Sequence, residues 1–159
     1  MLGRYTIPMT ITSTAFQKGE HIPKEQGHAG GNVSPPLTFS EVPPEAKSLV
    51  LTVEDLDAPH GTFTHWLIYN MSPATMQILA GGTPLEGTQA TNDFGNQAYD
   101  GPAPPSGAHR YVFKLSALDS PLSGVRPTDT RQQIDQAMEG HVIDEAQLEG
   151  LYAADQESS

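Results

Sequence analysis

The chain of 159 residues contains no cysteine. Disulfide bonds, thiol nucleophiles and zinc–thiolate sites are therefore excluded. The sequence also has no uninterrupted stretch of 18 apolar residues, and residues 1–14 contain no apolar run of signal-peptide length. These two absences predict a protein without stable membrane insertion, and we expect it in the cytoplasm.

Positive charge is scarce in this sequence. Eight Lys and Arg residues stand against 19 Asp and Glu residues, which gives a formal net charge of −11. Because no basic patch is visible, nucleic acid and anionic membrane surfaces should be repelled, and we expect no nucleic-acid partner. The carboxylates that are densest from Asp129 onward are interpreted as a solvated surface.

Glycine and proline, in contrast, are abundant, with 15 and 14 residues. This composition favours many short elements joined by ordered turns over a helix bundle. The sequence has no internal repeat and no linker, so residues 1–159 are expected to form one domain. Its core is expected at about residues 10–153, followed by a frayed tail at residues 154–159.

Alternating apolar residues predict the main strands. These strands are expected at residues 48–54, 64–71 and 110–118, with a further strand at residues 147–152. Residues 129–139 are expected to form a helix that is capped by Thr128 or Asp129 and ended by Gly140. Residues 20–36 and 83–105 are interpreted as long loops, so a domain dominated by β-structure fits best.

Polar residues lie at the ends of two of these strands. Asp55 has the same parity as the apolar residues of its strand, and His109 and Tyr111 share the parity of Phe113. Because side chains alternate along a strand, we expect this carboxylate, imidazole and phenol to point toward the interior. Buried carboxylates and imidazoles need partners, and a polar cluster that opens into a pocket with His65 would provide them.

Each of these residues also has a purely structural interpretation. Asp55 and Asp57 suit a turn, because aspartate accepts hydrogen bonds from the backbone two residues further on. His65 and His109 could each be a buried histidine with a structural partner. The loop from Gly101 to Pro105 is either an ordered surface loop or a rigid rim with free N–H donors for an anion.

Four short motifs share a family resemblance. Residues 32–37 read Asn-Val-Ser-Pro-Pro-Leu, residues 55–59 read Asp-Leu-Asp-Ala-Pro, and residues 65–66 read His-Trp. Residues 99–111 read Tyr-Asp-Gly-Pro-Ala-Pro-Pro-Ser-Gly-Ala-His-Arg-Tyr. In this order and spacing they resemble the phosphatidylethanolamine-binding protein family, in particular its short bacterial and archaeal members described as Raf kinase inhibitor-like.

The resemblance implies a mainly β fold of two antiparallel sheets in Greek-key order with one or two peripheral helices. It also implies a pocket for phosphate-like anions. The residues that would line this pocket are Asp55, Ala58, Pro59, His65, Gly101, Pro104, Pro105, His109 and Tyr111. Arg110 is expected to form a structural ion pair instead. The sequence departs from the family pattern at Leu56, where Pro is usual, and at Phe63, where many members carry Trp.

We therefore expect a non-enzymatic protein without a cofactor that binds a small anionic or phosphorylated ligand. Members of the family also suggest a protein partner such as a kinase or protease, a homodimer, and a cis bond between Ala58 and Pro59. Protonated histidine would favour an anion, so binding should weaken above about pH 6.5, the ordinary pKa of histidine.

Other functions remain open from the residues alone. Asp55, His65 and His109 make the two-histidine, one-carboxylate set of non-haem metal enzymes, although the usual close His-x-Asp spacing is missing. A hydrolase is less favoured, because the sequence has no Gly-x-Ser-x-Gly elbow and no His-Glu-x-x-His motif.

Overall fold

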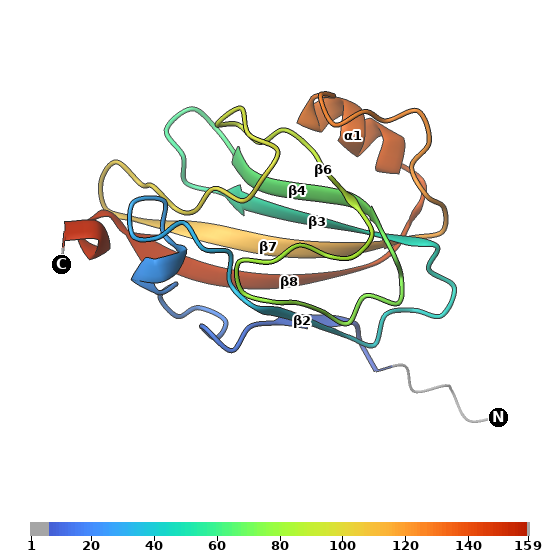
Figure 1. The fold of residues 1–159 in the computed structure, drawn as a ribbon, viewed down its shortest axis with the longest axis horizontal. Coiled ribbons are helices and arrows are strands. Elements are labelled where there is room, and N and C mark those ends of the chain that lie inside the picture. Colours follow the sequence, from blue (N-terminus) through green and yellow to red (C-terminus); the bar gives the residue numbers. More distant parts are fainter. Residues whose placement is uncertain (1–6, 159) are drawn as a thin grey trace.

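The larger of two antiparallel sheets has the strand order β6-β4-β3-β7-β8 (Figure 1). The computed structural model describes residues 7–158. The strands of this sheet are β3 (Ser48–Asp55), β4 (Phe63–Met71), β6 (Thr88–Gln89), β7 (Ala108–Leu118) and β8 (Val142–Ala153). Strand β7 returns to pair with β3 rather than with β6, so β7, β3, β4 and β6 have the spatial order of a Greek key.

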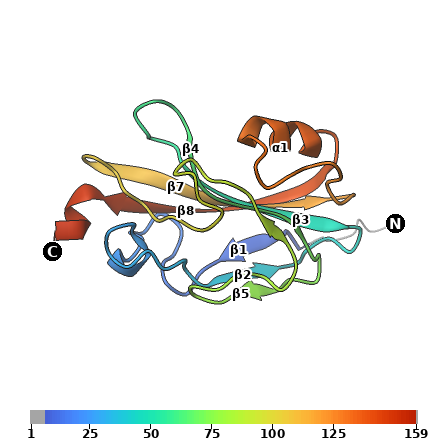
Figure 2. The same ribbon diagram turned by 45° about the horizontal axis from the view of Figure 1, so that its top comes forward.

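The smaller sheet has three short strands in the order β1-β2-β5. They are β1 (Thr10–Thr12), β2 (Leu37–Ser40) and β5 (Gln77–Ile78). Figure 2 shows this sheet stacked on one face of the larger sheet. The prediction of a mainly β fold with two antiparallel sheets is confirmed, although these three strands are too short to be recognised from alternation.

The alternation in the long strands divides the larger sheet into two faces. Leu49, Leu51 and Val53 of β3 belong to the core between the sheets, together with Phe113 of β7. Val50, one position out of phase, belongs instead to a second core beneath the helix. The larger sheet is therefore covered on both faces, and parity along β3 and β7 determines which side chains reach the core between the sheets.

A single α-helix, α1 (Arg131–Met138), covers the other face of the larger sheet (Figure 2). Its N-cap is Thr130, whose side chain accepts from the Gln133 backbone while the Gln133 side chain accepts from Thr130. The prediction of Thr128 or Asp129 as the cap is therefore wrong, because only Thr130 forms this reciprocal box. Gly140, with a φ of +82°, follows the helix as expected.

Two 3₁₀ helices complete the fold, η1 (Lys24–Gln26) and η2 (Ala154–Ser158). The second occupies the segment that the sequence suggests is a frayed tail. Gln156 accepts from the Ala153 N–H and donates to the Ile22 carbonyl, which holds this end of the chain against the loop before η1. Peptide bonds in the described residues are all trans, so the bond between Ala58 and Pro59 is not cis. No described helix combines the length and apolar character needed to span a membrane.

Candidate functional site

The antiparallel pairing of β3 with β7 brings the polar ends of both strands together. Asp55 lies opposite Tyr111 in the register, and its carboxylate accepts from His109 Nδ1 at 2.7 Å. The other carboxylate oxygen accepts from the Asp57 N–H at 2.8 Å. Asp55 is thus both the turn residue and the core-facing residue that the sequence suggests. With Nδ1 directed at a carboxylate, Nε2 of His109 is the nitrogen left for a ligand.

His65 enters the same cluster from β4. Its Nδ1 lies 2.7 Å from the carbonyl oxygen of Asp100, and because a carbonyl only accepts, Nδ1 carries the proton. Burial lowers the pKa of His65, and the hydrogen bond to Asp100 and the charge of Asp55 oppose this effect only in part. Near neutral pH the ring is therefore uncharged, and its Nε2 is a hydrogen-bond acceptor.

Tyr111 completes the cluster between the two imidazoles. Its ring lies edge-on to His65 with centroids 5.3 Å apart and is stacked with His109 at 6.5 Å. The hydroxyl is buried and forms no hydrogen bond of full geometry, although it lies close to the Asp55 carboxylate and to the backbone of Ala103. Burial, followed by the charge of Asp55, raises the pKa of this phenol, so it remains a donor. Native proteins rarely leave such a group unpaired, which makes it a candidate contact for a ligand.

The four side chains that the sequence places at strand ends are all buried. The exposed fractions of the whole residues are 4% for Asp55, 3% for His65, 8% for His109 and 0% for Tyr111. The parity argument for Asp55, His109 and Tyr111 is therefore confirmed. Their action as ligand-binding residues stays a prediction.

A second carboxylate, that of Asp100, organises the loops around the cluster. It accepts from the side-chain amides of Asn32, Asn92 and Asn96 at 2.8–3.2 Å. Burial would raise the pKa of Asp100, but these hydrogen bonds outweigh burial and hold the pKa below its usual value. Asn32 also accepts from the Gly101 N–H at 2.7 Å, so this network fixes the loop that enters β7.

Gly101 is part of this hydrogen-bond network, and its N–H is not free to donate to an anion because it donates to Asn32. A Cβ atom at this position would lie 2.0 Å from the Gln26 carbonyl oxygen, so only glycine allows the two loops to approach. Asn32 and Asp100 were not assigned a role from the sequence, although both occur in the motifs that carry the family resemblance. The motifs contain both residues, but the contact between Asn32 and Asp100 was not predicted because 68 positions separate them in the sequence.

The remaining predicted pocket residues lie on the flanking loops. Pro104 is buried and Ala58 is half-buried, whereas Pro59 and Pro105 are exposed. All four are close in sequence to Asp55 or His109. Their contribution to a pocket wall stays a prediction.

Arg110 forms the structural ion pair that the sequence suggests. Its guanidinium donates to both carboxylate oxygens of Asp57 at 2.9 and 3.0 Å, and its N–H donates to the same carboxylate at 2.8 Å. The hydrogen bonds from Arg110 lower the pKa of Asp57 to about 2. This ion pair connects the turn after β3 to the start of β7. It also engages the guanidinium of Arg110, the arginine nearest in sequence to His109, with a protein carboxylate.

Aromatic rings that were not predicted from the sequence to belong to the site line one side of His65. The Phe63 and Phe94 rings lie 5.3 Å from the His65 ring, and the His28 ring stacks on Phe94 at 5.0 Å. Phe94 and His28 are exposed at this edge of the cluster. Phe63 occupies the position where the sequence departs from the family's tryptophan.

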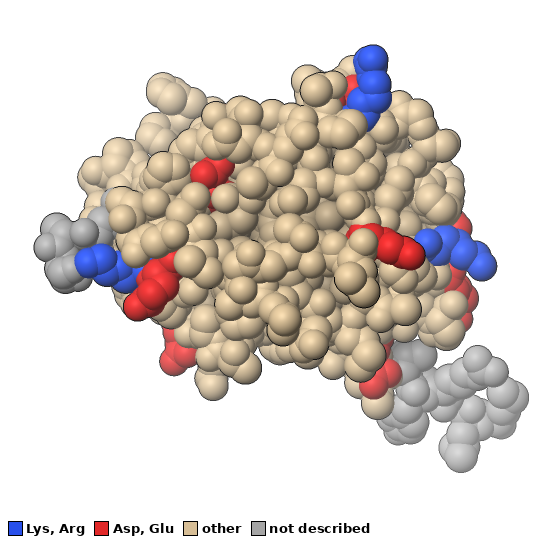
Figure 3. Space-filling view, in the orientation of Figure 1, with Lys and Arg blue, Asp and Glu red and all other residues tan. Residues whose placement is uncertain are grey.

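Fixed positive charge is missing from this part of the chain. Residues 61–109 contain no Lys or Arg and only three carboxylates. In Figure 3 the charged side chains lie mainly toward the margin of the face that is shown, which the loops after β4 cross. Within residues 7–158 no group of three or more His, Asp or Glu side chains is arranged to hold a metal ion.

Comparisons with known proteins agree with the fold and with the motifs. The family model described as phosphatidylethanolamine-binding protein matches residues 12–153. A UPF0098 protein from Methanothermobacter thermautotrophicus is 44% identical over 91% of this chain and 98% of its own length. A UPF0098 protein from Chlamydia trachomatis is 45% identical over 92% of this chain and 100% of its own length.

Two solved structures show the same architecture. A putative phosphatidylethanolamine-binding protein homologue from Chlamydia trachomatis superposes with a TM-score of 0.86, at 43% identity over 91% of this chain and 97% of its own. E. coli YbcL, described as a member of the mammalian family, gives the same TM-score at 28% identity over 92% and 99%. From its family-model match and these relatives, the chain belongs to the phosphatidylethanolamine-binding protein family.

Proposed function

We propose that this protein is a non-enzymatic binding protein that recognises a phosphoryl group at the cluster of Asp55, His65, His109 and Tyr111. The observation that carries the proposal is the buried Tyr111 hydroxyl, which has no hydrogen bond in full geometry and lies between two imidazoles whose Nδ1 atoms are both held by protein oxygens. His109 Nε2 and the Tyr111 hydroxyl are potential donors, while His65 Nε2 is an acceptor. The source of the phosphoryl group would be free phosphate, a phosphorylated head group, or a phosphorylated residue on a partner such as a kinase or protease.

The charges of the cluster favour a protonated phosphate. An unpaired Asp55 would repel an anion at about 4 Å by roughly 4 kcal/mol in a surface-like dielectric. Protonated His109 would offset this repulsion through its 2.7 Å contact with Asp55. Neutral His65 would accept a hydrogen bond from a phosphate hydroxyl, so one cation and one phosphate proton together replace the missing Lys and Arg.

Isothermal titration with phosphate, phosphoryl-ethanolamine and O-phosphoserine tests this proposal. We expect saturable binding by the parent and a loss of about tenfold or more in His109→Gln, which keeps polarity without the charge. The control variant His141→Gln replaces a histidine that is also paired through Nδ1 with a carboxylate, that of Asp119. Equal binding by the parent and a folded His109→Gln variant would refute the proposal.

The metal-enzyme alternative receives no specific support. Asp55 uses both carboxylate oxygens in protein hydrogen bonds, and within residues 7–158 no group of three or more His, Asp or Glu side chains is arranged to hold a metal ion. We therefore propose binding without catalysis.

A further inference from the structure

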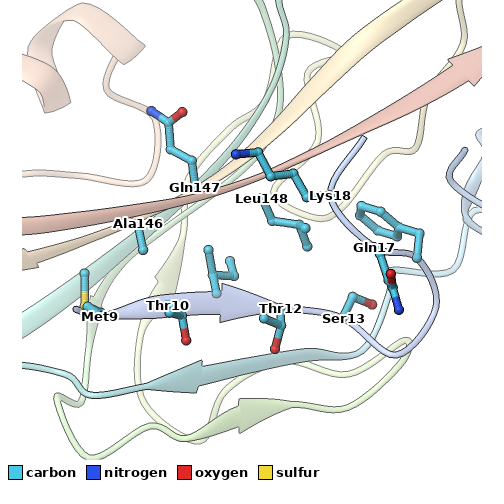
Figure 4. Close-up of a pocket in the computed structure, with 11 residues that line it drawn as sticks. Met9, Thr10, Thr12, Ser13, Gln17, Lys18, Ala146, Gln147 and Leu148 are labelled. Carbon is cyan, nitrogen blue, oxygen red and sulfur yellow. The ribbon is translucent and has the colours of Figure 1, made fainter. Parts of the chain in front are cut away.

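We propose a second binding site, for a small carboxylic acid with an alkyl tail, in the cavity between β1 and β8. This cavity has a volume of about 490 Å³, which lies within the usual range for small-molecule sites. It is lined by β1, by the segment that follows it, and by residues 146–148 of β8 (Figure 4).

The floor of the cavity is part of the core between the two sheets. Met9, Ile11, Phe16 and Leu148 belong to this core, as does Ala146, and all five line the cavity. In Figure 4 the side chains of Ala146 and Leu148 point from β8 toward β1. Among residues 7–158, β1 pairs with β2 and residues 146–148 of β8 pair with β7, so no ladder of hydrogen bonds joins these two edges of the sandwich. An alkyl chain in this cavity would bury apolar surface against the core.

The charge of the lining selects the head group. Of the eleven lining residues none is acidic, although the chain carries 19 carboxylates, and Lys18 is the one charged residue. Among the side chains that the structure describes, no carboxylate lies within salt-bridge distance of Lys18. Thr12, Ser13 and Gln17 give the rim neutral hydrogen-bonding groups. The lining therefore complements one negative charge at the end of an apolar tail.

This cavity is separate from the phosphoryl cluster. Along β7 and β8, His109 pairs with Tyr152, whereas Leu148 pairs with Phe113, four residues further along. A rise of about 3.3 Å per residue places the two sites roughly 13 Å apart. No lining residue of the cavity is a member of the phosphoryl cluster, so the two ligands should bind independently.

Titration with decanoate, followed by calorimetry and heteronuclear NMR, tests this assignment. We expect saturable one-site binding of decanoate below its micelle concentration, with shifted resonances at β1 and at residues 146–148. Decanol should bind about threefold more weakly, because it lacks the charge that Lys18 recognises. Excess phosphate should not displace decanoate, which separates this site from the one proposed above.

Two variants examine the head and the tail of the ligand separately. Ala146→Leu would fill the cavity and lower affinity about tenfold. Lys18→Gln, an exposed change that preserves the fold, would remove the preference for decanoate over decanol, while the control Lys47→Gln would keep it. No saturable binding, displacement by phosphate, or an unchanged preference in Lys18→Gln would each overturn the proposal.

Discussion

At the scale of single residues, the two imidazoles of the cluster differ. That of His65 is neutral near pH 7, and that of His109 is paired with a carboxylate. His65 loses its solvent shell, so its charged form is disfavoured, whereas His109 keeps a carboxylate partner at 2.7 Å. Two histidines near the starts of two strands of one sheet therefore have different chemistry. The expectation that protonated histidine attracts an anion stays a prediction, and the lowered pKa of His65 disfavours this ring as the cation.

The lowered pKa of His65 predicts how stability depends on pH. Below about pH 6.5 the unfolded chain binds a proton that the folded chain does not, so His65 destabilises the fold progressively as pH falls toward its folded pKa. Thermal unfolding between about pH 5 and pH 7 should thus show a smaller loss on acidification in His65→Gln than in the parent.

The readout of this experiment is the slope with pH and not the absolute melting temperature, because His65→Gln also removes ring contacts with Phe63 and Phe94. His60→Gln, which replaces an exposed histidine, serves as the matched control. Parallel pH profiles for the parent and His65→Gln would show that the buried ring does not resist protonation.

At the scale of elements, alternation predicted β3, β4 and β7, but only the second half of β8 and none of the short strands. Strands β3 and β7 have eight and eleven residues, so alternation shows both their existence and the face on which Asp55 lies. Strands of two or three residues, such as β1 and β5, carry too little pattern. The Asp100 network also escaped prediction, because its hydrogen bonds connect residues of separate loops that no periodicity relates.

Helix α1 offers a prediction about capping. Thr130→Ala removes the side-chain oxygen that accepts from the Gln133 N–H and should cost about 1 kcal/mol in the free energy of unfolding. Thr128→Ala, at an exposed position that the sequence had also suggested as the cap, should have little effect. Denaturant unfolding of both variants measures the difference, and equal losses would contradict the assignment of Thr130.

At the scale of the whole molecule, the proposed phosphoryl site lies in a strongly acidic protein. A net charge of −11 opposes the approach of an anion, and residues 61–109 provide no fixed cation to compensate. Composition alone therefore argues against a doubly charged phosphate. The proposed recognition by His65, His109 and Tyr111 would resolve this conflict if the anion brings a proton of its own.

The comparison of phosphate with sulfate tests this central claim most directly. Both anions are tetrahedral, but near neutral pH only phosphate retains a hydroxyl group. This hydroxyl can donate a hydrogen bond to Nε2 of neutral His65. Titration of the parent near pH 6 should show phosphate binding at least about tenfold more tightly than sulfate, because a buried acceptor facing sulfate would remain unpaired. Equal affinities for the two anions would contradict the account, and His65 would then have no part in recognition.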